Sequence, residues 1–216
     1  MLAIPLGQRT NTRGRRSPHR EAQAALSGVS GGNAPVVIVL AAGLGERFRA
    51  AGGLQHKLDA PLGHQTVRAH VLAAVQASGL AWHVVERKHT QHLHAQGMGS
   101  SIATGVAATA HANGWLILPA DLPLIQPETL RRLAQALRTQ SVVVPCVKGQ
   151  RGHPVGFGAM CRDALLALKG DEGAKSVLQQ YSAQLINLDD VGCILDVDTP
   201  EALAEAERVW RARQPG

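Results

Sequence analysis

An unbroken apolar run at residues 35–40, Pro-Val-Val-Ile-Val-Leu, is the feature that most limits how this chain can fold. The run is short and rich in β-branched residues, and it shows no polar alternation, which is typical of a strand buried on both faces. Such a strand needs helices on either side of its sheet. The chain provides them, because apolar runs alternate with helical patterns as far as residue 210. We therefore predict a three-layer α/β/α domain with a mostly parallel, Rossmann-like sheet.

The other elements are predicted from the same periodicities. Further strands are expected at 83–85, 115–118, 141–147, 155–157, 185–188 and 193–195. Helices are expected at 66–77, from Pro127 onward, and from Pro200 to about residue 210. Ligands of open α/β sheets bind beyond the carboxyl ends of the strands, so the functional residues should lie in the loops that follow the apolar runs.

The formal charge of +6 invites a nucleic-acid partner, but the charge is unevenly distributed. Residues 1–33 contain five of the 22 Lys and Arg residues and one of the 16 Asp and Glu residues, a net +4. This segment has no periodic apolar face, so we predict a disordered basic extension at 1–33 and a single domain at 34–216. The domain has 17 basic and 15 acidic residues, and aromatic residues make up 3% of the chain. A small anionic ligand is therefore favoured over a nucleic acid.

Compartment is predicted from hydropathy and cysteine usage. The longest apolar run, residues 34–44, contains a proline and a glycine and is far shorter than the roughly 20 residues that cross a bilayer. The three cysteines are far apart, odd in number and form no Cys-x-x-Cys pair. We expect no membrane partner and a reducing, cytoplasmic location.

The apolar run leads into a glycine-rich loop, Leu40-Ala-Ala-Gly-Leu-Gly-Glu-Arg47, which continues to Lys57. Its glycines allow backbone N–H groups to turn toward a phosphate. A dinucleotide fingerprint is excluded because Phe48 replaces its third glycine and no acidic residue follows about 20 positions later. A P-loop is excluded because its Gly-Lys-Ser/Thr sequence is missing around Lys57. The loop is then either a triphosphate cradle with Arg47 and Lys57 as cations, or an ordinary turn with solvated basic residues.

Carboxylates follow two of the predicted strands. Asp121 lies in a turn flanked by prolines, where it could hold Mg²⁺ through hard oxygen ligands or act as a local backbone cap. Asp196 and Asp198 stand two residues apart and could project to the same side. We predict Asp198 as a second metal contact, with capping of the helix that follows as the alternative.

Three further segments carry polar residues. The serines of Gly-Met-Gly-Ser-Ser, residues 97–101, could contact a nucleobase or cap a helix. His153, in a Gly-His-Pro turn, could contact an anionic acceptor or be a satisfied turn histidine. The acids of residues 170–173 suit the dipole of a following helix, and the segment could belong to an acceptor-binding loop. No cysteine or acidic ligand lies within the histidine segment, so no transition-metal site is expected at His89, His92 and His94.

Taken together, these motifs resemble one family. The loop 40–47 with its lysine, Gly-Met-Gly-Ser-Ser, Pro-Ala-Asp-Leu-Pro, Gly-Gln-Arg-Gly-His-Pro and Leu-Asp-Val-Asp-Thr-Pro occur in the order seen in the molybdenum cofactor cytidylyltransferases. The sugar-nucleotide pyrophosphorylases are similar more distantly. The resemblance covers residues 35–210 and implies the nucleotide-diphospho-sugar transferase fold. It also implies Mg²⁺-dependent transfer from CTP to the phosphate of molybdopterin, with release of pyrophosphate.

The resemblance implies roles for individual residues. Arg47, Lys57 and Asp121 would be catalytic, Asp121 and Asp198 would bind Mg²⁺, and His153 would contact the acceptor. The nucleotide-binding residues would be Leu40, Ala41, Ala42, Gly43, Gly45, Lys57, Gly97, Ser100 and Ser101. The implied partners are a nucleoside triphosphate, a molybdopterin-type acceptor and a molybdoenzyme of the xanthine dehydrogenase family.

The chain departs from the family pattern in two places. The stretch 48–56 is longer than in relatives, and the region 82–97 offers one strand where relatives have strand, helix and strand. Base selection is therefore less constrained than phosphate binding, and a GTP- or sugar-phosphate-using transferase is the alternative. From a different class, the chain could be a non-catalytic protein that carries the finished cofactor to a molybdoenzyme.

Overall fold

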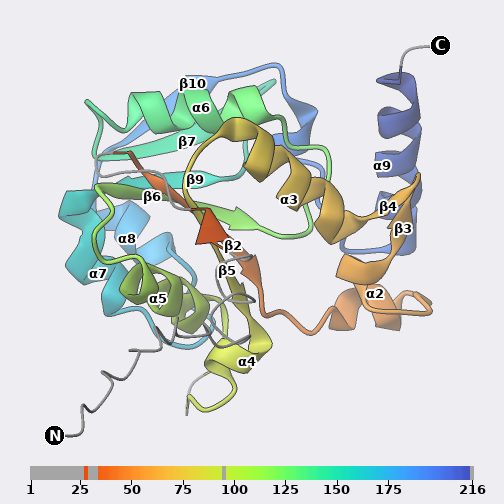
Figure 1. The fold of residues 1–216 in the computed structure, drawn as a ribbon, viewed down its shortest axis with the longest axis horizontal. Coiled ribbons are helices and arrows are strands. Elements are labelled where there is room, and N and C mark those ends of the chain that lie inside the picture. The colour runs from red at the N-terminus through yellow and green to blue at the C-terminus, as the bar shows by residue number, and fades with distance from the viewer. Residues whose placement is uncertain (1–26, 29–33, 94–95, 215–216) are drawn as a thin grey trace, which may run out of the picture.

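The computed structural model describes residues 27–28, 34–93 and 96–214 (Figure 1). The strands are β1 (Ser27–Gly28), β2 (Val36–Ala41), β3 (Pro61–Leu62), β4 (Gln65–Thr66), β5 (Trp82–Glu86), β6 (Gly114–Pro119), β7 (Val142–Val147), β8 (Gln150–Arg151), β9 (Val155–Gly158) and β10 (Ala183–Asn187). The helices are α2 (Glu46–Ala50), α3 (Val67–Ser78), α4 (Arg87–Thr90), α5 (Met98–Ala108), α6 (Pro127–Ala136), α7 (Arg162–Leu166), α8 (Lys175–Gln180) and α9 (Pro200–Ala212). Three short 3₁₀ helices are η1 (Lys57–Asp59), η2 (Ala159–Cys161) and η3 (Val191–Cys193).

The main sheet has the strand order β1-β5-β2-β6-β9-β7-β10, with β8 paired to β7. β2 is central and parallel to both β5 and β6, and β10 is parallel to β7. β9 runs antiparallel between β6 and β7, so the sheet is mixed but mostly parallel. Because β2 and β6 are parallel neighbours, their carboxyl ends meet at one edge, and the loops after Ala41 and Pro119 come together there.

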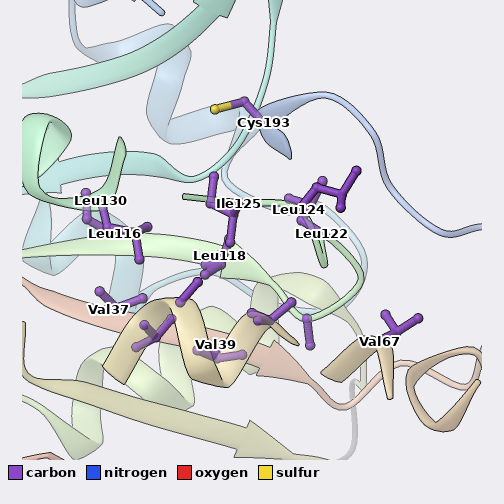
Figure 2. Close-up of a cluster of buried hydrophobic side chains, with 14 of the residues drawn as sticks. Val37, Val39, Val67, Leu116, Leu118, Leu122, Leu124, Ile125, Leu130 and Cys193 are labelled. Carbon is purple, nitrogen blue, oxygen red and sulfur yellow. The ribbon is translucent and has the colours of Figure 1, made fainter. Parts of the chain in front are cut away.

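Helices cover both faces of the sheet, which confirms the predicted three-layer architecture. α3 and α6 pack on one face, and α5, α7 and α8 pack on the other (Figure 1). Val37 and Val39 of β2 point into the first layer, with Leu116 and Leu118 of β6 beside them (Figure 2), whereas Ile38 points into the second. Both sides of β2 are therefore buried in apolar cores, which explains why its sequence lacks polar alternation.

The strand predicted at 193–195 is wrong. Residues 191–193 form η3, and the Asp190 carboxylate accepts a hydrogen bond from Gly192 N at 3.0 Å at the start of this turn. The Cys193 carbonyl accepts a hydrogen bond from His153 N at 2.8 Å, so this backbone pairs with a turn rather than with a strand. An apolar Cys-Ile-Leu sequence does not reveal a local side-chain cap, and this is why periodicity misassigns it.

Several shorter elements were not predicted. The glycine-rich loop contains α2 and ends in η1, and β3 and β4 form a separate hairpin. Ser27 and Gly28, within the segment predicted as an extension, form β1 and pair antiparallel with β5. The remainder of residues 1–33 lies outside the described residues, so the predicted disorder and domain boundary stay predictions. Within the described ranges, no helix has the length and apolar character to cross a membrane.

Candidate active site

A cleft of about 820 Å³ opens at the carboxyl ends of the parallel strands. Its walls come from the loop after β2, from η1, from the amino end of α5, from the turn after β6 and from the segment that leads into α9. This is the edge at which ligands of open α/β sheets bind. The predicted site residues that line it are Leu40, Ala42, Gly43, Gly45, Arg47, Lys57, Gly97, Ser101, Asp121, His153 and Asp198. Ala41 and Ser100 are not among the lining residues.

At the centre of the cleft, the ammonium of Lys57 lies between two carboxylates. Lys57 Nζ is 2.5 Å from Asp121 Oδ2 and 2.5 Å from Asp198 Oδ1. The side chains of Lys57 and Asp121 are 14% and 15% exposed, so the ion pair is shielded from water. Burial opposes both charges, but the ion pairs outweigh it: the pKa of Lys57 is raised, mainly by Asp121, and the pKa of Asp198 is lowered, mainly by Lys57.

Local structure fixes each carboxylate. The turn that carries Asp121 is tied to the central strand by a hydrogen bond from Ala120 N to Leu40 O at 3.1 Å. Val197 N donates to the Asp121 carbonyl at 2.9 Å, which holds the Asp198 segment beside the Asp121 turn. The capping alternative for Asp198 does not apply, because the Thr199 hydroxyl caps α9 by accepting from Ala202 N at 3.2 Å. The Asp198 side chain is thus directed to the cleft.

His56 anchors Lys57, and sequence analysis missed it. Its Nε2 lies 2.9 Å from the Gly43 carbonyl, and its Nδ1 accepts from Leu58 N at 3.3 Å. These contacts together require the neutral tautomer with hydrogen on Nε2, which clips the glycine-rich loop to the start of η1. The signal was a histidine directly before the lysine, but its role depends on a ring contact across 13 residues.

Arg47 contacts the same centre from an exposed position. Its Nη1 lies 3.2 Å from Asp198 Oδ2, while its side chain is 85% exposed. It belongs to α2, a single turn that begins after Gly45 in the left-handed conformation, with φ of 64°. Arg47 is therefore free to turn toward an anion, unlike Lys57. Arg87 and Arg151 also line the cleft; Arg87 directly follows β5, so the strand-end rule would have found it.

The predicted base-binding turn holds two different serines. The Ser101 hydroxyl lines the cleft and donates to Gly97 O at 2.9 Å. Ser100 is buried, and its Oγ accepts from Gly170 N at 3.0 Å. We correct the expectation that Ser100 faces a nucleotide: its hydroxyl fastens the 170–173 loop to α5. Gln96 and Met98 line the cleft beside Gly97 and were not predicted.

His153 lies at the far wall, in the turn before β9. Its backbone N–H is held by the Cys193 carbonyl, and its ring stands in the cleft. Desolvation by the cleft walls lowers the pKa of His153, and the nearby carboxylates of Asp121 and Asp196 oppose this shift in part. This shift favours the neutral imidazole, which can donate or accept a hydrogen bond there.

The histidine segment has a structural contact. His89 Nδ1 accepts a hydrogen bond from Glu86 N at 3.1 Å at the start of α4, and its ring stacks on His83 with centroids 6.1 Å apart. His94 lies outside the described residues. Within the described part of the chain, no group of three or more His, Cys, Asp or Glu side chains could by itself enclose a metal.

The Asp121 and Asp198 carboxylates nevertheless suit a divalent cation that shares its shell with a ligand. Asp121 Oδ1 is buried and has no hydrogen-bond partner among the described residues. An unpaired buried carboxylate oxygen is costly, and hard oxygens of this kind are the ligands that Mg²⁺ and Mn²⁺ prefer. With two carboxylate ligands, most coordination positions of the metal are left to water and to phosphate oxygens, which is usual for Mg²⁺.

Comparison with known proteins places the chain in a family. Residues 37–185 match the family described as the MobA-like NTP transferase domain. Purine catabolism protein PucB of Bacillus subtilis is 32% identical over 150 residues, which covers 65% of this chain and 71% of PucB. The bifunctional protein GlmU of Xanthomonas oryzae is 30% identical over 145 residues, but this covers only 30% of GlmU.

Solved structures show the same fold. A nucleotidyl transferase from Methanothermobacter has a TM-score of 0.69 at 21% identity and covers 85% of this chain and 100% of that one. Rv0371c of Mycobacterium tuberculosis, solved in complex with manganese, gives 0.61 at 22%, with 82% and 100% coverage. Molybdopterin-guanine dinucleotide biosynthesis protein A of Archaeoglobus fulgidus gives 0.64 at 17%, with 82% and 99% coverage.

The fold is the nucleotide-diphospho-sugar transferase fold, and the family match over residues 37–185 places the protein in the nucleotidyltransferase class. Within that class, the chain belongs to the family of MobA-like NTP transferase domains.

Proposed function

We propose that this protein transfers a nucleoside monophosphate from a nucleoside triphosphate, CTP in the first instance, to the phosphate of molybdopterin, with release of pyrophosphate. The observation that carries the proposal is the centre formed by Lys57, Asp121 and Asp198, next to a glycine-rich loop at the carboxyl edge of the sheet. That centre combines a buried cation and exposed loop backbone, which suit a triphosphate, with an unpaired carboxylate oxygen, which suits the divalent metal that accompanies it.

In such a transfer, the basic residues and the carboxylates of the centre would have different roles. An oxygen of the acceptor phosphate attacks the α-phosphorus, the bond from that phosphorus to the bridging oxygen breaks, and pyrophosphate leaves with the electron pair. Arg47 and Lys57 would neutralise the charge that builds on the leaving group. Asp121 and Asp198 would hold Mg²⁺, which supplies Lewis-acid stabilisation of the phosphate oxygens.

No general base is required, because a phosphate nucleophile is already ionised at neutral pH. This fits the surroundings of His153, whose pKa is lowered by desolvation. A neutral imidazole would orient the acceptor phosphate by a hydrogen bond. The nucleotide would be contacted by the cleft-lining residues of the two glycine-containing segments, Leu40, Ala42, Gly43, Gly45, Gly97 and Ser101.

The choice of CTP and molybdopterin rests on the motif resemblance and on relatives in the same family. A structural neighbour is named for molybdopterin-guanine dinucleotide biosynthesis, which supports a molybdopterin acceptor and keeps GTP as a competing donor. The proposal includes Mg²⁺ as the metal, a cytoplasmic location, a domain at 34–216 and delivery of the product to a molybdoenzyme of the xanthine dehydrogenase family. A sugar phosphate is the second candidate acceptor, because the motifs also resemble those of the sugar-nucleotide pyrophosphorylases.

The direct test measures pyrophosphate release. Protein, Mg²⁺ and molybdopterin are incubated with CTP, GTP, ATP or UTP in turn, and N-acetylglucosamine 1-phosphate replaces molybdopterin in a parallel series. We expect release with CTP and molybdopterin. Thermal shifts with each nucleotide give an independent ranking, since a ligand at 100 times its Kd stabilises the fold by about 2.7 kcal/mol.

Each other outcome has a defined meaning. Release with GTP or with the sugar phosphate would replace the donor or the acceptor and keep the reaction. Binding of molybdopterin without release from any nucleotide would refute catalysis and favour a carrier of the finished cofactor.

A further inference from the structure

A second cavity of about 290 Å³ adjoins the cleft, and Arg47, Lys57, Asp121 and Asp198 are not among the residues that line it. The two cavities share the lining residues Leu40, Met98, Pro119, His153 and Asp171, so a single bound molecule can extend from one into the other. Its volume is close to the lower end, about 300 Å³, of the usual range for small-molecule sites.

The walls of this second cavity are mostly apolar, and the polar side chains among its lining residues are those of His153, Asp171, Glu172 and Lys175. The walls come from the sheet and from the helices on one of its faces, where α5 and α8 lie (Figure 1). Ile102, Ile117 and Phe157 are each less than 5% exposed, and Val155 stands two residues before Phe157 on the same side of β9. Apolar walls of this kind suit the face of a flat ring. They do not suit a phosphate, because they offer no hydrogen bonds to offset the free-energy cost of removing it from water.

The rim carries the polar groups. Asp171, Glu172 and Lys175 are exposed residues that line the cavity, and within the described residues neither carboxylate makes a hydrogen bond or an ion pair. Two unpaired carboxylates can accept hydrogen bonds from adjacent N–H donors on the edge of a heterocycle. An aliphatic ligand would desolvate these carboxylates and offer them no donor, so it fits less well.

The loop that carries Asp171 and Glu172 is held in place by contacts with the amino end of α5. Gly99 N donates to Gly170 O at 2.8 Å, and the Ser100 hydroxyl accepts from Gly170 N at 3.0 Å. A Cβ atom added to Gly97 would lie 2.3 Å from Asp171 Oδ1, so the carboxylate sits directly on that glycine. The 170–173 loop and the amino end of α5 therefore form one wall, and the position of the carboxylates does not depend on a ligand.

Resting on the proposed function, we propose that the second cavity binds the flat heterocyclic ring of the acceptor, an amino-substituted pteridine, with its N–H-bearing edge at Asp171 and Glu172. The phosphate-bearing arm of the acceptor then passes His153, which lines both cavities, and reaches Lys57 and Asp121 in the main cleft. The nucleotide occupies the larger cleft, so donor and acceptor are bound at the same time.

The test uses the ring alone. Pterin is titrated against the full-length protein by ligand-detected NMR, beside lumazine, in which a carbonyl replaces the amino group of the same bicyclic ring. We expect pterin to bind with a Kd on the order of a millimolar or below and lumazine to bind at least about tenfold more weakly, because one charge-assisted hydrogen bond is lost. Saturating CTP with Mg²⁺ should not displace pterin.

Variants locate the site. Glu172→Gln should weaken pterin binding at least about tenfold and reduce the preference over lumazine. Leu178→Trp, which fills the cavity from α8, should abolish binding of both rings. Asp189→Asn is the matched control, because Asp189 is an exposed carboxylate that lines neither cavity. Melting temperatures check that each variant is folded.

The outcomes separate this inference from the proposed function. Equal binding of pterin and lumazine by the wild-type protein, displacement of pterin by CTP, or no pterin binding would overturn the inference, and the wild-type comparison needs no variant to fold. Pyrophosphate release from CTP and molybdopterin would still support the function in each of these cases. Pterin binding in a protein that releases no pyrophosphate would instead support the cavity and refute the reaction.

Discussion

Two carboxylates in this molecule, Asp121 and Asp190, follow strands and are largely buried, but their surroundings are opposite. Both oxygens of Asp190 accept hydrogen bonds, from Gln126 N and Nε2, Thr129 Oγ1, Gly192 N and Arg213 Nη2. Asp121 has one ion pair, with Lys57, and its Oδ1 has no partner among the described residues. A carboxylate whose oxygens both have hydrogen-bond partners, here called saturated, fixes structure. A carboxylate with an unpaired oxygen at a cleft is available to a ligand.

The largest effect should come from Asp121→Asn, which keeps the shape and removes the charge. We expect pyrophosphate release to fall at least about a hundredfold, because transition-state charge stabilisation is lost. The free energy of unfolding should fall less than in the Asp190 variant below, because Lys57 keeps its ion pair with Asp198. Rates at saturating nucleotide and urea unfolding curves measure the two quantities. Asp189→Asn serves as the control, and full activity in Asp121→Asn would remove this residue from the mechanism.

Asp190→Ala should have the opposite effect, a large loss of stability with little loss of activity. It leaves the Gln126 and Gly192 amides and the Thr129 hydroxyl without their acceptor, so we expect a loss of about 3 kcal/mol or more in the free energy of unfolding. Activity per folded molecule should remain within about twofold of wild type, measured at a temperature well below the midpoint of unfolding. If Asp190→Ala is as stable as the wild type, the hydrogen bonds to Asp190 do not contribute to the free energy of unfolding.

Lys57→Met should sharpen the comparison by leaving Asp121 without an ion pair and Asp198 paired only with Arg47. The ammonium now lies between Asp121 and Asp198, where a shared divalent ion would also have to lie, so its removal should raise the affinity for Mn²⁺ without nucleotide by about tenfold, or 1.4 kcal/mol. Calorimetry measures the affinity directly. Lys88→Met, on an exposed lysine paired with Glu86, is the matched control. An unchanged affinity would mean that the ammonium does not compete with the metal.

The smallest effect concerns pH. The pKa of Asp198 is lowered from its ordinary 3.8, so its contribution to stability is complete above that value and is lost as pH falls through the folded-state pKa, where the unfolded chain binds more protons. The pKa of Lys57 is raised above 10.5, so its contribution is lost only as pH rises beyond that value. The stability difference between wild type and Asp198→Asn, without metal, should therefore be constant from about pH 5 to 9 and shrink toward pH 3. A difference that shrank between pH 5 and 7 would contradict the ion pair.

Much of the site was accessible from sequence because strand ends are local features. The apolar run of β2 predicts a strand buried on both faces, and topology then places the loop residues after it, Gly43 and Arg47, at the ligand-binding edge. Asp121 is found in the same way after β6. Their meeting was expected because β2 and β6 were predicted for one parallel sheet, and the structure pairs them as neighbours.

Other features depend on contacts that no window of sequence contains. Lys57 and Asp198 are 141 residues apart, and their contact requires the Val197–Asp121 hydrogen bond that aligns two loops. Ser100 and Ser101 are adjacent and chemically identical, but helical rotation turns one to the cleft and the other to Gly170. The strand predicted at 193–195 failed because a side-chain cap from Asp190 overrode an apolar pattern.

By itself, the sequence determined the layer architecture, the place of the glycine-rich loop and the chemical types available at the sheet edge, because these depend on periodicity and on the residues at strand ends. The tertiary structure decided which carboxylate is saturated and which is left open, that an ammonium separates Asp121 from Asp198, and that an apolar cavity adjoins the cleft. The physical reason is that saturation and cavity shape are set by groups brought together from distant parts of the chain, and a local pattern does not encode those distances.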